Sequence, residues 1–470
     1  MSFITRRKPI AAPVHGDGQH RLKATLSWPH LVALGVGAII GTGIYTLTGI
    51  GAGLAGPAVI LSFAIAGAVC AFAALCYAEM ATLIPHAGSA YTYSYAGMGE
   101  LVAWIVGWSL ILEYTVVCSA VAVGWSGYAQ GWLAAHDWGL PAALAGGPGA
   151  GGLVNLPAVL VTLVVTGMLL VGTRESATVN FILVIIKVVA LAGFVILTLP
   201  SFNPAHFHPF MPFGFSGHED ADGTKRGVMA AAALIFFAFY GFDAISTAAE
   251  ETKNPSRDLT IGIIGSMVIC TIIYMVVAAV ALGASPYDVF SKSGEPLAFI
   301  LRELKHPLTA TLIAGAAIVA LPTVIMVFMF GQSRVFFAMA RDGLLPRGLA
   351  AISSRGVPVV VTLFTGVVAA AIAGFFPLKI IAELANAGTL AAFIATAVAM
   401  MVLRVQAKDL PRPFRTPVWW LVGPLAVVGC LYLFWSLPFL TKKLFMVWNL
   451  FGVGVYLLYG RKHSRLAPAE

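Results

Sequence analysis

The amino-acid sequence predicts an all-α integral membrane protein with twelve transmembrane helices. Of its 470 residues, 59% are hydrophobic and only 10% are charged, which is too apolar for a soluble globular protein. The apolar residues fall into long stretches, and about 20 such residues are needed for a helix to cross a bilayer. The expected spans are approximately 30–48, 57–80, 101–131, 154–172, 178–200, 228–250, 260–284, 308–338, 357–376, 380–403, 417–438 and 443–460.

Positive charge predicts the orientation of these spans. Most of the 28 Lys and Arg residues lie in segments that are cytoplasmic if the N-terminus is inside, as the positive-inside rule requires. We therefore expect an even number of helices in the cell inner (plasma) membrane, with cytoplasmic tails at 1–27 and 463–470. Residues 1–21 are polar and basic, so no cleavable signal peptide is expected. The net charge of +8 does not indicate nucleic-acid binding, because the basic residues lie at segment ends.

Two of the spans carry signals of an interrupted helix. Residues 35–49 read GVGAIIGTGIYTLTG, and Gly41 and Gly43 allow the backbone to open. Open backbone at membrane depth is tolerated only where it lines a cavity, although small residues also serve close helix packing. Residues 237–251, FAFYGFDAISTAAEE, carry Gly241 in mid-segment followed by Asp243. Paired interruptions of this kind are typical of the substrate site of a secondary transporter.

The spacing of the two interruptions predicts an internal repeat. They fall in the first and sixth spans, which suggests two five-helix halves, 28–200 and 201–404, with helices eleven and twelve appended over 405–462. Because five is odd, the second half must be inverted relative to the first.

Ionisable residues inside the apolar segments are few, and each is costly at bilayer depth unless it has a partner or faces a cavity. Lys187 lies deep in the fifth span, where it can gain and lose a proton or replace a sodium ion; the alternative is a snorkelling lysine. Glu113 could pair with a cation, relay a proton, bond to open backbone or be structural. Asp243 is expected to cap the second half of helix six. Glu79 and Glu383 lie nearer segment ends and are expected to be structural.

Helix ends at the interruptions predict the ligand chemistry. Free N–H groups at the start of a half-helix, around Thr42 and Ile44, would bind a carboxylate. Carbonyls at the end of a half-helix, near Ile39 and over 237–240, would accept from an ammonium group. Both kinds of group together suit an α-amino acid zwitterion.

Several stretches resemble the amino acid–polyamine–organocation (APC) superfamily, and within it the bacterial relatives of cationic amino acid transporters. They are GVGAIIGTGIYTLTG, YAEMATLIPHAGSAYTYSY, GWSLILEYTV, GFDAISTAAEETKNPSRDL and GQSRVFFAMARDGLLP. The resemblance covers essentially the whole chain. It implies the LeuT-type fold, a 5+5 inverted repeat with broken helices 1 and 6.

The resemblance also implies roles for individual residues. The substrate carboxylate would bind the N–H groups of Thr42 and Gly43. The amine would bind the carbonyls of Ile39, Phe237 and Tyr240, with Phe237 as an aromatic lid. Lys187 and Glu113 match the positions of the coupling lysine and the helix-three acid, and Leu321 matches the pocket position of helix eight. Pro322 is a departure from the family that leaves the local path of helix eight open.

These observations predict a secondary active transporter that carries L-amino acids with protons by alternating access. Leu321 favours small neutral substrates such as alanine, whereas pairing with Glu113 would favour arginine or lysine. The alternatives are an amino acid exchanger and a nutrient sensor without transport. No enzyme motif, metal cluster, cofactor or sodium site is expected. The expected partners are the substrate and the lipid bilayer, with the protein acting as a monomer or with a small regulatory membrane subunit.

Overall fold

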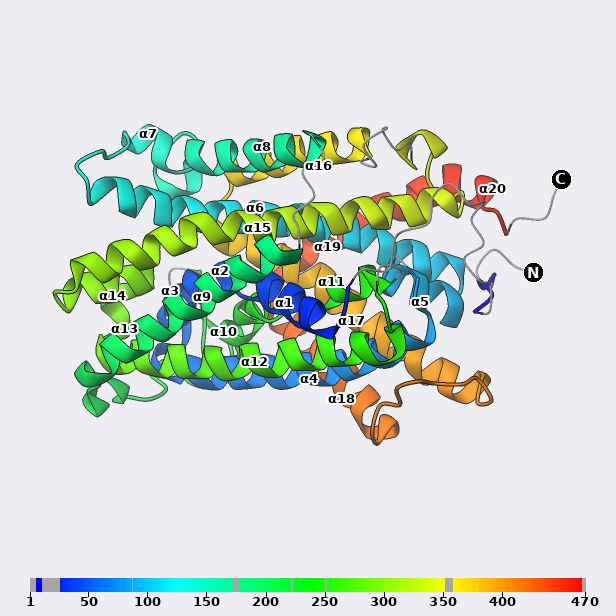
Figure 1. Ribbon diagram of the computed structural model, residues 1–470, viewed down its shortest axis with the longest axis horizontal. Helices are drawn as coiled ribbons and strands as arrows, with labels where there is room; N and C mark the ends of the chain where they lie inside the picture. Colours follow the sequence, from blue (N-terminus) through cyan, green and yellow to red (C-terminus); the bar gives the residue numbers. More distant parts are fainter. Residues whose placement is uncertain are drawn as a thin grey trace.

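The chain is a bundle of long helices that run roughly parallel to its longest dimension (Figure 1). The computed structural model describes residues 6–10, 26–86, 88–171, 177–220, 223–249, 252–350 and 358–466. Within these residues nine helical stretches are long and apolar enough to cross a membrane. Three shorter apolar helices coincide with the predicted spans 30–48, 154–172 and 357–376; they are Trp28–Ile39, Leu156–Leu170 and Val359–Phe375.

Fifteen helices of the described chain, some of them short pieces of an interrupted span, correspond to the predicted spans. They are α1 (Trp28–Ile39), α2 (Thr42–Tyr45), α3 (Leu47–Ala55), α4 (Val59–Leu83), α6 (Glu100–Ala134), α8 (Leu156–Val171), α9 (Ala177–Thr198), α10 (Val228–Ile235), α11 (Phe242–Thr247), α12 (Pro255–Ala284), α15 (Pro307–Arg341), α16 (Val359–Phe375), α17 (Leu378–Gln406), α18 (Trp419–Ser436) and α19 (Phe439–Val455). Prolines begin α12 and α15, where a missing N–H costs nothing.

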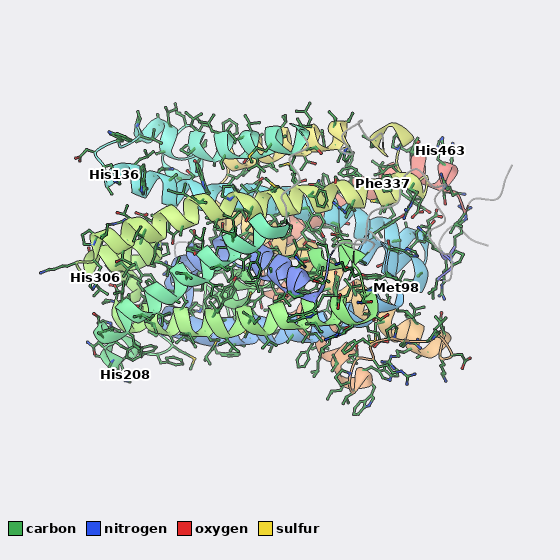
Figure 2. The ribbon with its side chains drawn as sticks, in the orientation of Figure 1. Met98, His136, His208, His306, Phe337 and His463 are labelled. Atoms are coloured by element: carbon green, nitrogen blue, oxygen red, sulfur yellow. The ribbon has the colours of Figure 1, made fainter. Side chains whose placement is uncertain are left out.

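Short elements connect the long helices. They are α5 (Ala90–Gly97), α7 (Ala142–Ala145), α13 (Tyr287–Phe290), α14 (Pro296–Glu303), α20 (Arg461–His463) and an antiparallel pair, β1 (His218–Glu219) with β2 (Lys225–Arg226). Figure 2 shows His136, His208 and His306 at one end of the bundle and His463 at the other.

The two ends of the described chain meet at Asp342. Lys8 forms an ion pair with Asp342, and the Arg465 N–H donates to the Asp342 carbonyl. Both described chain ends therefore lie at the same end of the bundle.

The first and sixth spans are each divided in the structure. The first continues beyond the predicted residue 48, because α1 is followed by α2 and α3 as far as Ala55. The sixth consists of α10, a short 3-10 turn at Phe236–Ala238, and α11. Most of the two predicted tails lies outside the described residues.

Helix α6 is joined to α19 by tryptophan side chains. The indole N–H of Trp104 donates to the Gly452 carbonyl at 2.8 Å. Trp108 and Trp448 each donate to the other's backbone carbonyl, at 3.0 and 2.9 Å, and their rings stack. A side chain at Gly452 would overlap the Trp108 ring, so glycine permits this close approach. These bonds hold α19 against α6.

Glu79 ties α4 to the end of α17 and to the loop that follows it. Its carboxylate is fully buried and forms ion pairs with Arg404 at 2.7 Å and Arg412 at 3.2 Å. It also accepts a 2.8 Å hydrogen bond from the Thr416 N–H. The expected structural role of Glu79 agrees with these contacts.

We predict that Glu79→Gln lowers the unfolding free energy by about 3 kcal/mol, because it leaves two largely buried guanidinium groups without their buried counter-charge. Thermal unfolding of the purified protein in detergent measures the effect as a lower Tm. Glu383→Gln is the matched control, since the buried Glu383 carboxylate accepts a 3.2 Å hydrogen bond from a neutral group, the Thr441 hydroxyl. Equal Tm values for the two variants would contradict this role of Glu79.

Candidate functional site

The first interruption separates α1 from α2 at Ile40 and Gly41. Gly41 is extended, with φ −142° and ψ −150°, and α2 begins at Thr42. Thr42 and Gly43 are the first two residues of α2, so their N–H groups have no hydrogen-bond partner within that helix. The Ile39 carbonyl, at the end of α1, accepts a 2.6 Å hydrogen bond from the Tyr274 hydroxyl of α12.

The second interruption separates α10 from α11 at Gly241. Its φ of +121° is a conformation that glycine adopts readily and other residues do not. Its N–H donates to the Asp243 carboxylate at 3.0 Å, and the Tyr114 hydroxyl donates to the same carboxylate at 3.1 Å. Asp243 therefore lies inside the first turn of α11 and accepts from Gly241, the residue that precedes this helix.

The two interruptions are in direct backbone contact. A Cβ atom at Gly43 would lie 2.3 Å from the Ala238 Cα atom, and one at Gly241 would lie 3.0 Å from the Ala38 carbonyl carbon. Contacts this short exist only because neither glycine has a side chain. Gly124 of α6 similarly admits the Thr42 side chain, since a Cβ atom there would lie 2.3 Å from Thr42 Cγ2.

A small cavity lies between the interruptions. Its walls are formed by Ala38, Ile39, Gly41, Thr42, Gly43, Val117, Val121, Phe237, Tyr240, Val324 and Phe328. The cavity is small: the volume open to the centre of a water molecule is about 10 Å³, which is close to the minimum that one water needs. The Phe237 and Tyr240 rings meet edge to face at 4.9 Å, and the buried Tyr240 hydroxyl has no hydrogen-bond partner among the described residues.

Sequence reasoning located about half of these walls. The predicted residues Ile39, Gly41, Thr42, Gly43, Phe237 and Tyr240 line the cavity, whereas the predicted binding residues Ile44 and Leu321 do not. Gly241, predicted as a helix break, lies at the second interruption. On helix eight the wall is formed by Val324 and Phe328, so the contact lies one turn beyond the predicted Leu321. Val117 and Val121 were missed, although they follow Glu113 at intervals of four residues and so share its helix face.

Lys187 joins three helices beside the cavity. Its fully buried ammonium group donates to the Gly37 carbonyl of α1 at 2.8 Å and to the Thr323 hydroxyl of α15 at 3.3 Å. A cation is favourable near the C-terminal end of α1, where the helix dipole is negative. The ammonium therefore holds α9 to the half-helix that precedes the first interruption.

Glu113 lies outside the cavity walls and is fully buried in α6. Neither carboxylate oxygen has a hydrogen-bond partner among the described residues. The next residue of α6, Tyr114, donates to the Asp243 carboxylate, so this part of α6 lies against the second interruption. Within the described ranges no group of three or more His, Cys, Asp or Glu side chains has the arrangement of a metal site.

Comparison with known proteins identifies the family of this chain. The family model described as "Amino acid permease" matches residues 26–459. The branched-chain amino acid permease BcaP of Bacillus subtilis (strain 168) is 44% identical over 469 residues, covering 98% of this chain and 99% of the relative. The methylthioribose transporter of the same strain is 42% identical over 470 residues, covering 99% and 100%.

A plant relative belongs to the subgroup expected from the sequence. Cationic amino acid transporter 4, vacuolar, of Arabidopsis thaliana is 38% identical over 428 residues, covering 87% of this chain and 68% of the relative. With its apolar helices, the chain is a multi-pass membrane protein. It belongs to the amino acid permease family of the APC superfamily and is a transporter, not an enzyme.

Proposed function

We propose that this protein is a secondary active transporter that moves a neutral L-amino acid together with a proton by alternating access. The observation that carries the proposal is the small apolar cavity enclosed by two helix interruptions in backbone contact. Among the described residues, nine long helices and three shorter ones fit twelve crossings of a LeuT-type 5+5 fold, and the shared position of the two described chain ends fits an even number. Both termini are then cytoplasmic in the plasma membrane.

Backbone groups would hold the amino acid zwitterion. The N–H groups of Thr42 and Gly43 stand at the start of α2 and suit the carboxylate. The Ile39, Phe237 and Tyr240 carbonyls suit the ammonium group. The bond from Tyr274 leaves one lone pair of the Ile39 carbonyl for this purpose, since a carbonyl oxygen has two.

Apolar walls around the remaining space favour a neutral side chain. Val117 and Val121 approach from α6, and Val324 and Phe328 from α15. A guanidinium or ammonium side chain would have to lose its hydration among these groups, which costs several kcal/mol unless it is well paired. The relative named as a branched-chain amino acid permease supports an aliphatic substrate, from alanine to leucine in size. The cationic alternative would depend on Glu113, which lies behind the wall.

Lys187 and Glu113 are the proposed coupling groups. When Lys187 loses its proton, the charge that binds the Gly37 carbonyl disappears, and α1 is held less firmly to α9 and α15. The lysine ammonium also supplies the positive charge that a sodium ion would otherwise bring. Uptake of a panel of labelled amino acids into proteoliposomes, with and without an inward proton gradient, tests the function. Uptake that ignores the gradient would contradict symport.

We predict that Gly43→Val abolishes amino acid binding while the protein still inserts into the membrane. The new side chain must occupy the space of the Ala238 backbone and so forces the two interruptions apart. Direct titration of purified protein with leucine or alanine measures the loss. Gly193→Ala, on α9 where no heavy atom lies within 4 Å of the added Cβ, should bind normally. Normal uptake by the valine variant would contradict the assignment of the substrate site to the two interruptions.

Replacing Lys187 with alanine should uncouple transport from protons. We expect exchange of internal for external amino acid to persist, while an inward proton gradient no longer raises uptake. Lys292→Ala, an exposed lysine near α13, serves as the control and should keep its response to the gradient. If the gradient still stimulates the alanine variant of Lys187, another residue carries the coupling.

Two substitutions on α15 test which residue forms the wall of the cavity: Val324, as in the structure, or Leu321, as expected from the sequence. Val324→Ala should enlarge the cavity and raise the affinity for leucine relative to alanine by about threefold or more, as expected for one or two added methylene contacts. Leu321→Ala, outside the cavity walls, should leave that ratio unchanged. Isothermal titration of both variants measures it, and the opposite pattern would favour Leu321 as the wall.

A further inference from the structure

Helix α15 contains a proline at the level of the cavity. Pro322 lies inside the helix Pro307–Arg341 and has no N–H group to donate. In an unbroken helix that N–H would bond to the carbonyl four residues earlier, which is Ile318. Within a bilayer a freed carbonyl has no water to bond with, so a neighbouring group must satisfy it.

Trp125 of α6 supplies that bond. Its indole N–H donates to the Ile318 carbonyl at 2.8 Å. The indole has no other polar group, so this single bond satisfies the tryptophan and the freed carbonyl together. Helices α6 and α15 pack against each other along their length, as Figure 1 shows, so this contact belongs to a broad helix interface.

The bond lies next to the residues that form the site. Trp125 follows the cavity residue Val121 by one helical turn. On α15, Pro322 directly precedes Thr323, which accepts from Lys187, and Val324, which lines the cavity. The path of α15 at Pro322 thus determines how far both side chains project towards α6 and α9.

We propose that Trp125 and Pro322 act as one unit that sets the path of α15 through the cavity wall, so that Trp125 is a positioning residue for substrate selectivity. Trp125 does not line the cavity and would act only through α15. The effect on selectivity rests on the proposed transport function, because it is measured as a ratio of amino acid affinities. The shared role of the two residues can also be tested by thermal unfolding, which needs no substrate.

A double-mutant cycle tests the unit. Trp125→Phe keeps a ring of similar shape but removes the donor. In the Pro322 protein it should change the ratio of leucine to alanine affinity by about threefold or more, the size expected for one lost hydrogen bond. In the Pro322→Ala background the alanine N–H can bond to the Ile318 carbonyl, so the same substitution should change the ratio by less than about 1.5-fold.

Trp132→Phe is the matched control, because this indole lies on the same helix and its ring packs against His136. It should leave the ratio unchanged in both backgrounds. An equal effect of Trp125→Phe in the two backgrounds, or no effect in either, would overturn the proposal.

Thermal unfolding of the wild type, Trp125→Phe, Pro322→Ala and the double variant provides a second measurement. Trp125→Phe should lower Tm clearly in the Pro322 protein and only slightly beside Pro322→Ala. If Trp125→Phe alone yields no folded protein, recovery of folded protein in the double variant supports the unit, and failure to recover contradicts it. Should the wild-type protein bind no amino acid, the proposed function fails, and the Tm cycle still decides whether the two residues act together.

Discussion

The backbone contact between the two helix interruptions is the constraint on which the rest of the site depends. Gly43 lies against Ala238, and Gly241 lies against Ala38, at distances that exclude any side chain. This contact brings the start of one half-helix and the end of another to a single point. Backbone at these helix ends then borders a shared space, and no charged side chain is among the cavity walls.

Buried polar bonds hold the opened backbone in place. Two come from neighbouring helices: Tyr274 of α12 donates to the Ile39 carbonyl, and Lys187 of α9 donates to the Gly37 carbonyl. The third is local, because Asp243 of α11 accepts from the Gly241 N–H. Together they replace hydrogen bonds that an unbroken helix would have made. In the bilayer such replacement is obligatory, because an unsatisfied backbone group there costs several kcal/mol.

Local signals in the sequence were enough to locate the interruptions and the buried lysine. Glycines within an apolar run, such as Gly41 and Gly241, and a lone charge such as Lys187, are conspicuous without any tertiary information. The rotation of α15 was not predictable in this way. That helix is apolar on several faces, so periodicity does not tell Leu321 from Val324. The bond from Tyr274 on α12 joins segments 235 residues apart and becomes visible only in the fold.

The tryptophan bonds between α6 and α19 have a mechanical consequence. Large apolar side chains of α19, among them Phe439, Met446 and Leu450, are exposed on the outside of the bundle, where they would meet lipid. Hydrogen bonds from indole N–H groups to carbonyls in an apolar medium resist sliding of α19 along α6, because a displaced donor has no water to bond with instead. A lateral displacement of α19 is therefore resisted by α6, the helix that also carries the cavity residues Val117 and Val121. The lipid-facing surface of α19 and one wall of the cavity thus belong to the same bonded pair of helices.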